Sequence, residues 1–142
     1  MRNKELILVL LLFLSAAGLV NVSLVFWKVS GQVNAPCVIF KGCDYVIFSD
    51  YAKFLGVPLT WWGMSFYFLL FVLTIFYYRF SNSFFWRLLA ALVLVGFLFS
   101  LYLLYVQLFK VNSLCSYCLV SLLDTSVIFL LTFSTLFRKF PA

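Results

Sequence analysis

The chain has 142 residues, of which 66% are hydrophobic and only 10% are charged. A water-soluble domain of this length could not bury so much apolar surface, so the composition excludes that class and predicts an integral membrane protein. The formal net charge is +6. Because the basic residues flank apolar stretches and do not gather in one patch, we expect no nucleic-acid partner.

Four apolar stretches are long enough to cross a bilayer, which takes about 20 helical residues. Backbone polar groups have no water partner in lipid, so each stretch is predicted to be a helix. The expected spans are about 6–27, 57–78, 88–106 and 115–137, with external loops at 28–56 and 107–114. The predicted fold class is all-α, a four-helix transmembrane bundle forming a single domain over residues 1–142. The first apolar run is longer than that of a cleaved signal peptide, which favours a retained helix.

The basic residues predict the orientation in the membrane. Six flank one face and four flank the other, and the face with more Lys and Arg is expected to be cytoplasmic. The first group is Arg2, Lys4, Arg79, Arg87, Arg138 and Lys139, and the second is Lys28, Lys41, Lys53 and Lys110. We therefore expect a multi-pass protein of the inner (cytoplasmic) membrane with both termini inside and every cysteine on the external, periplasmic side.

The long external loop is expected to carry a short helix. Ser49 would be its N-cap, and Gly56 would supply the left-handed conformation at its end. Pro58 comes next, where the second membrane helix begins, a position that tolerates its missing N–H.

Four cysteines, Cys37, Cys43, Cys115 and Cys118, carry the predicted chemistry. They permit three disulfide pairings, and the spacing favours Cys37 with Cys43 and Cys115 with Cys118. The second pair lies where the fourth helix starts, so the positive end of the helix dipole can stabilise a thiolate there. Two pairs in series predict a thiol–disulfide relay.

Other interpretations stay open at this stage. The cysteines could be two structural disulfides, although such short loops gain little from closure. They could also form a Cys₄ zinc site, since zinc accepts four thiolates; we expect no metal. A transporter or binding module is a third class, which would normally show polar residues in several helices.

The sequence resembles the vitamin K epoxide reductase family, and specifically its bacterial quinone-reducing members. The matching segments are, in chain order, Cys37 and Cys43, Ser49, Gly56-Val57-Pro58, Gly63-Met64-Ser65-Phe66-Tyr67 and Cys115-Ser116-Tyr117-Cys118. The resemblance implies that Cys37 exchanges with a separate exported thioredoxin-like protein and that Cys43 pairs transiently with Cys115. It further implies that Cys118 faces a membrane quinone (ubiquinone or menaquinone) and that Ser49 positions the loop over the site.

Two comparisons refine this resemblance. The disulfide-bond-forming membrane protein B family has a similar activity, but its CxxC pair comes early and its loop pair late, the reverse of the order here. Vertebrate epoxide reductases place asparagine and tyrosine where this chain has Leu59 and Leu122. The chain therefore looks like a quinone reductase, and vitamin K epoxide reduction is the alternative.

Candidate quinone-binding residues are those predicted to lie at the depth of Cys118 on the other helices. Together with the two leucines they are Asn21, Leu59, Trp62, Phe66, Tyr102 and Leu122. Asp124 is the only acidic residue inside a predicted span, and intramembrane carboxylates are functional candidates because they are costly to bury. Quinone reduction consumes protons, so Asp124 is a candidate proton relay.

Overall fold

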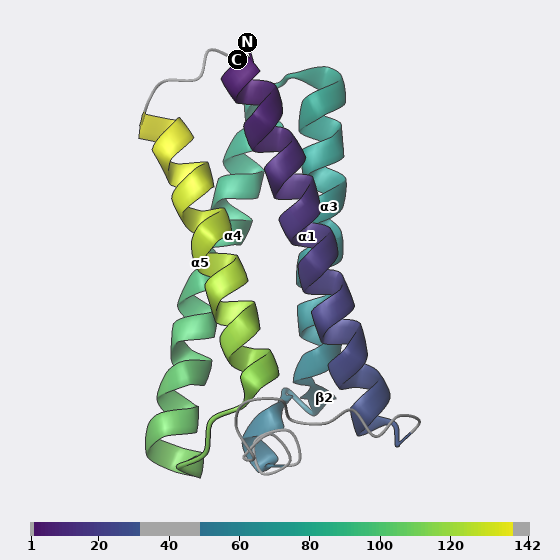
Figure 1. The fold of residues 1–142 in the computed structure, drawn as a ribbon, viewed down its shortest axis with the longest axis vertical. Helices are drawn as coiled ribbons and strands as arrows, with labels where there is room; N and C mark the ends of the chain where they lie inside the picture. The colour runs from purple at the N-terminus through teal and green to yellow at the C-terminus, as the bar shows by residue number, and fades with distance from the viewer. Residues whose placement is uncertain (1, 32–48, 138–142) are drawn as a thin grey trace.

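The computed structural model describes residues 2–31 and 49–137, and four long helices dominate it (Figure 1). These helices are α1 (Arg2–Val29), α3 (Leu59–Phe80), α4 (Ser83–Tyr105) and α5 (Ser116–Phe137). Each coincides with one predicted span, which confirms the all-α four-helix fold. The largest difference is at α4, which begins at Ser83 because the Asn82 side chain accepts a hydrogen bond from the Phe84 N–H at 3.0 Å.

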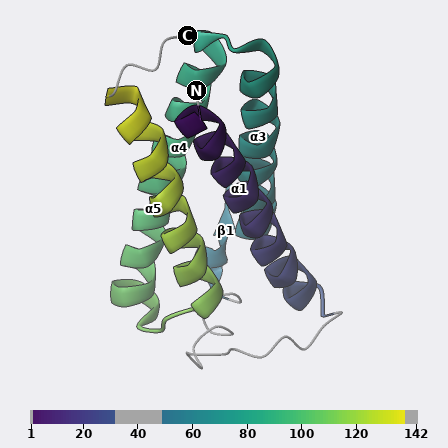
Figure 2. The same ribbon diagram turned by 45° about the horizontal axis from the view of Figure 1, so that its top comes forward.

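The helices run up and down in an antiparallel bundle. Each packs on two neighbours: α1 on α3 and α5, and α4 on the same two helices. The start of α1 and the end of α5 lie at one end of the bundle, as do the end of α3 and the start of α4. The opposite end carries the segment before α3 and the turn between α4 and α5 (Figures 1 and 2).

All four helices are long and apolar enough to span a membrane. Large apolar side chains point outward, with Phe13, Leu98 and Leu130 each more than half exposed, as expected for a surface in contact with lipid. Small hydroxyl side chains lie inside instead, where Ser15 and Thr74 are almost fully buried. Each donates to the carbonyl one turn earlier on its own helix, which satisfies the hydroxyl without water. The chain is therefore a multi-pass membrane protein.

Two glycines allow α3 to approach its neighbours closely. A Cβ added at Gly18 of α1 would overlap the Tyr67 ring, and one added at Gly96 of α4 would overlap the Phe66 ring. The two rings are themselves in edge-to-face contact, with centroids 5.2 Å apart. Aromatic side chains from α3 thus fill the space that these glycines leave on both sides.

A short helix does begin after Ser49, as predicted, but it is shorter than expected and does not extend to Gly56. Only a single 3₁₀ turn forms, η1 (Asp50–Ala52), and the Ser49 side chain makes no capping hydrogen bond to it. Strands β1 (Lys53–Phe54) and β2 (Val57–Pro58) then pair as a hairpin. Its two turn residues, Leu55 and Gly56, both have positive φ, at 54° and 78°. Gly56 does adopt the expected left-handed conformation, but in a hairpin turn of the kind whose strand twist requires it.

The predicted loop at 107–114 is also shorter than expected. Helix α4 continues into a π-helical segment, η2 (Val106–Val111). Asn112 ends it in the left-handed conformation, and the backbone N–H of Ser113 donates to the Gln107 carbonyl at 3.1 Å. A wider helical turn adds one residue to the ladder and rotates the residues after it, a feature frequently found beside functional sites.

Candidate active site

Cys115 lies immediately before α5 and is fully buried. Its backbone N–H donates to Oε1 of Gln107 at 3.0 Å, and its carbonyl accepts from the Leu119 N–H at 3.0 Å. Gln107 is itself only 3% exposed and comes from the π-helical segment. Because a buried N–H without an acceptor is costly, this side chain holds the backbone of Cys115 in place. The prediction that this cysteine stands at the head of the fourth helix is confirmed.

Cys118 lies in the first turn of α5 and is only partly buried. Around Cys115 it forms one apolar cluster with Val25 and Val29 of α1 and with Tyr117. The first turn of α5 brings the positive end of its helix dipole to this cluster. Of the two cysteines, Cys118 is both the more exposed and the one that lies farther along α5.

Asn21 joins α1 to the same turn. Its side-chain Nδ2 donates to the backbone carbonyl of Tyr117 at 3.0 Å. The sequence places Asn21 among the candidate quinone contacts, and the structure brings it next to the CxxC segment. Its amide N–H already has a protein acceptor there, so one evident task of Asn21 is to fix α1 against the start of α5.

The aromatic candidates lie on a different side of this end of the bundle. Trp62 and Tyr102 belong to a chain of rings in which Phe54 contacts Trp62 and Phe99, and Phe99 contacts Tyr102, with centroids 5.7–6.1 Å apart. The Trp62 Nε1 donates to the Phe54 carbonyl at 3.2 Å, which ties the hairpin to α3. Both Trp62 and Tyr102 are about half exposed. This ring chain therefore presents an aromatic surface across α3 and α4 beside the hairpin.

The remaining pocket candidates are in the interior or partly buried. Phe66 packs in the space beside Gly96. Leu59 opens α3 and Leu122 lies one turn beyond Cys118 on α5, and both are partly buried. The structure thus groups Trp62 with Tyr102 and places Asn21 with the cysteines, and a common quinone site for all six candidates stays a prediction.

A polar cluster that the sequence analysis missed lies one to two turns beyond Cys118. The Tyr67 hydroxyl crosses the bundle from α3 to α5, where it lies 2.9 Å from Ser121 Oγ and 3.2 Å from Thr125 Oγ1. Tyr67 is only 1% exposed. Asp124 interacts with this hydroxyl, and its Oδ2 is buried with no hydrogen-bond partner among the described residues. Because α3 contains many aromatic residues, nothing in the sequence distinguishes Tyr67 as the one that makes this contact with α5.

Cys37 and Cys43 lie outside the described residues, so their predicted pairing and roles stay predictions. The described segments on either side, the end of α1 and the turn before the hairpin, both lie at the end of the bundle where α5 begins (Figure 1). Within residues 2–31 and 49–137 no group of three or more His, Cys, Asp or Glu side chains is placed to hold a metal. A Cys₄ site would need the two undescribed cysteines and is therefore not tested.

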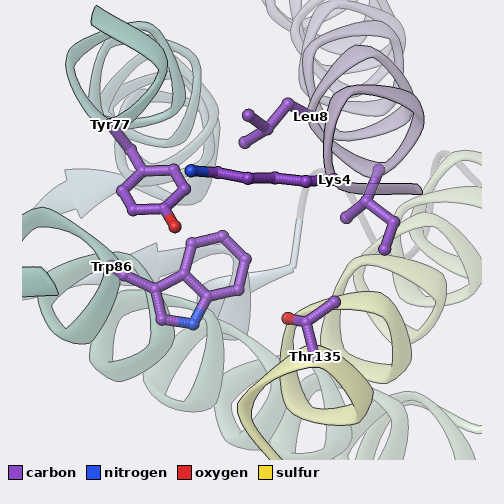
Figure 3. A pocket seen from close by; sticks show the side chains of 6 residues that line it. Lys4, Leu8, Tyr77, Trp86 and Thr135 are labelled. Carbon is purple, nitrogen blue, oxygen red and sulfur yellow. The ribbon is translucent and has the colours of Figure 1, made fainter. Parts of the chain in front are cut away.

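The opposite end of the bundle contains a small hollow lined by Lys4, Ile7, Leu8, Tyr77, Trp86 and Thr135 (Figure 3). The Lys4 Nζ lies 5.1 Å from the centre of the Tyr77 ring, a cation–π geometry. Tyr77 is ten residues beyond Tyr67 on α3, which is about 15 Å along the helix axis. This hollow is thus separate from the cysteines.

Comparison with known proteins agrees with this geometry. Residues 9–133 match the model of the vitamin K epoxide reductase family, a match that covers all four helices and the CxxC segment. A search of curated proteins finds no match to the chain.

Proposed function

Because the chain belongs to the vitamin K epoxide reductase family of membrane oxidoreductases, we propose that it reoxidises an exported thioredoxin-like protein and reduces a membrane quinone. The net reaction converts a partner dithiol and a quinone into a partner disulfide and a quinol. Two electrons and two protons pass between them, so no further reductant or oxidant is needed. The outcome is disulfide formation in exported proteins.

In this proposal the partner dithiol reduces the Cys37–Cys43 disulfide by thiol exchange, and Cys43 then attacks Cys115. The attack forms a Cys43–Cys115 disulfide and releases the Cys118 thiolate. Cys37 then attacks Cys43, which restores the Cys37–Cys43 disulfide and frees Cys115. Oxidation of Cys115 and Cys118 to a disulfide finally delivers two electrons to the quinone and closes the cycle. Ser49, which stands at the same end of the bundle as Cys115, would help to place the loop over that cysteine.

The order of the two α5 sulfurs along the helix is the observation that carries the proposal. Cys115 is buried at the outer end, held by Gln107, and Cys118 lies one turn deeper and is partly accessible. An electron carrier dissolved in lipid has to approach from the bilayer, while a protein partner has to approach from water. A pair that spans this boundary suits a relay between the two.

We propose that the quinone is reduced at Cys118, beside Leu122 on α5, and that the aromatic surface around Trp62 and Tyr102 at the same end of the bundle guides it from the bilayer. Leu59 and Phe66 of α3 are proposed as further apolar contacts. Quinone rings bind to apolar and aromatic linings with few polar groups. Leucine at positions 59 and 122 offers no side-chain hydrogen bond to an epoxide or a headgroup oxygen. This supports quinone reduction over epoxide reduction as the activity, with ubiquinone or menaquinone as acceptor.

Asp124 is proposed as part of the proton supply, since its Oδ2 is buried and lacks a partner among the described residues. The Asp124→Asn variant should then slow quinone reduction while leaving exchange with the partner protein intact. An unchanged rate of quinone turnover across pH would remove Asp124 from the mechanism.

The proposed orientation places the termini in the cytoplasm and the cysteines in the periplasm, with the inner membrane as location. The first residues of α1 and the α3–α4 turn, with Lys4, Arg79 and Arg87, share one end of the bundle. The hairpin and the CxxC segment share the other. Labelling of a single cysteine placed at the exposed Lys53 of the hairpin, in intact spheroplasts with a membrane-impermeant reagent, tests this assignment.

The central test combines purified protein in detergent with a reduced thioredoxin-like protein and a soluble quinone, and follows quinone absorbance. We expect quinone consumption that stops in Cys115→Ala and in Cys118→Ala, with Ser116→Ala as the matched control in the same turn. Undiminished consumption in Cys115→Ala would refute the relay. Metal analysis of the same preparations separates the zinc alternative, which requires about one zinc per chain.

A further inference from the structure

We infer that Tyr67 passes a proton, through the Ser121 hydroxyl, to the quinone that Cys118 reduces. This inference rests on the proposed function and adds a residue whose task is proton transfer. Three observations carry it: the burial of the hydroxyl cluster, the direction of its hydrogen bonds, and the helix face that it shares with Cys118.

The Tyr67 side chain is enclosed by protein on all sides. Its ring lies in the space left by Gly18 of α1, and its hydroxyl reaches α5 across the diagonal of the bundle. Only 1% of the residue is exposed. Most buried tyrosine hydroxyls find one partner, whereas this one has two hydroxyl partners, Ser121 and Thr125.

The Tyr67 hydroxyl can donate to the Ser121 carbonyl at 3.4 Å, and its bonds to the two neighbouring hydroxyls can take two directions. Thr125 Oγ1 donates its proton to the Ser121 carbonyl at 2.8 Å, so in its contact with Tyr67 it acts as the acceptor. When Tyr67 donates to Thr125, Ser121 donates to Tyr67. When Tyr67 donates to Ser121 instead, the Ser121 proton turns away from Tyr67. Each hydroxyl both donates and accepts, which is the property that a proton relay requires.

The Ser121 hydroxyl lies on the same side of α5 as the reacting sulfur. Cys118, Ser121 and Thr125 have a spacing of i, i+3 and i+7, which places them along one helix face. Side chains three residues apart on a helix have Cβ atoms about 5–6 Å apart. A quinone oxygen held beside Cys118 thus lies within reach of the Ser121 hydroxyl.

The proposed step conserves electrons and protons. Oxidation of the Cys115 and Cys118 thiols forms one S–S bond and releases two electrons and two protons. Quinone takes up both electrons and two protons and becomes quinol. Ser121 gives one of these protons to a quinone oxygen and regains one from Tyr67, which in turn is restored from the Asp124 carboxyl beside it. Asp124 regains its proton from one of the two that the thiols release, so the cluster ends in its starting state. The other released proton goes to the second quinone oxygen.

The test separates the two half-reactions of the cycle in purified full-length protein. Prereduced protein is mixed with excess soluble quinone, and a single turnover is followed by quinone absorbance in water and in heavy water. Oxidised protein is mixed separately with a reduced thioredoxin-like protein, and formation of the partner disulfide is followed. The variants are Tyr67→Phe and Ser121→Ala, and Tyr77→Phe is the control, because it removes a hydroxyl from a buried tyrosine of the same helix.

General acid catalysis contributes roughly 100- to 10,000-fold to a rate, so we expect Tyr67→Phe to slow quinone reduction by at least about 10-fold. The heavy-water isotope effect on this step should change with it, and partner oxidation should keep its wild-type rate. Ser121→Ala should behave alike and Ser121→Thr should restore the rate. Equal slowing of both half-reactions, or a wild-type rate of quinone reduction in Tyr67→Phe, would overturn the inference. Wild-type protein that reduces no quinone would refute the proposed function itself, and the inference with it.

Discussion

The hydrogen bond from Cys115 to Gln107 gives a sharp prediction about access to the buried sulfur. Gln107→Met keeps the length of the side chain and removes Oε1, the acceptor that lies 3.0 Å from the Cys115 backbone nitrogen. A buried donor left without a partner costs about 1–3 kcal/mol. Since the segment can recover hydration only by opening locally, we expect that free energy to appear as easier opening around Cys115.

The measurement is the rate at which a maleimide labels Cys115 in native detergent micelles. The protein carries this cysteine alone, with the other three replaced by alanine, so that no disulfide competes. At one decade per 1.4 kcal/mol, the expected cost raises the labelling rate about 5- to 150-fold. Leu108→Met is the matched control, because it places the same side chain at the exposed neighbouring position and should label no faster than the parent. Equal rates for Gln107→Met and the parent would show that this hydrogen bond does not hold the segment closed.

Three further variants test the contacts of α1 with α3 and α5. In Gly18→Ala the new methyl overlaps the Tyr67 ring, so the unfolding free energy should fall by about 1–3 kcal/mol in a denaturant titration followed by tryptophan fluorescence; an unchanged midpoint would contradict this contact. Lys4→Met keeps the apolar stem and loses the cation over Tyr77, which should cost about 0.5–1 kcal/mol in the same titration, and a gain in stability would argue against it. Asn21→Leu removes the hydrogen bond to the Tyr117 carbonyl and should speed amide exchange in the first turn of α5, with the end of that helix as internal reference.

The membrane helices can be predicted from the sequence because their cause is local. A run of about 20 apolar residues in lipid has no alternative to a helix, whatever surrounds it. The ends are set by finer features. Asn82, for example, caps α4 well before the predicted start, a choice that a continuous apolar run does not reveal.

The segment before α3 departs from its prediction for a physical reason. Ser49 and Gly56 fit the ends of a short helix, and a two-residue hairpin turn usually has Asn, Asp or Gly at its first position. Here that position is Leu55, which is 80% exposed and has positive φ. The hairpin is stabilised by tertiary contacts, because Phe54 packs on Trp62 and accepts its indole N–H. No local pattern contains that contact.

The candidate site likewise has one part that the sequence predicts and another that only the structure shows. The spacing of the cysteines and the apolar runs are enough to place Cys115 and Cys118 at the head of a helix. These sequence features do not reveal the roles of Gln107 and Tyr67. Gln107 reaches its hydrogen-bond partner only through an irregular turn, and the partners of Tyr67 are distant along the chain. Gln107 points at Cys115 only because α4 ends in a π-helical segment, and Tyr67 reaches Ser121 only because the helices are packed closely enough.

The absence of a side chain at Gly18 connects this packing to the proposed chemistry. Helices α3 and α5 lie diagonally across the bundle, and each packs on α1 and α4. A side chain that joins α3 to α5 therefore has to cross one of those two helices. The Tyr67 ring makes that passage over α1 at a place where its surface is bare backbone. Any side chain at position 18 would push the ring aside and break its contacts with Ser121 and Thr125, while the cysteines at the head of α5 would stay in place. Under the proposed mechanism, a glycine that touches neither sulfur nor quinone therefore controls proton delivery without affecting electron delivery.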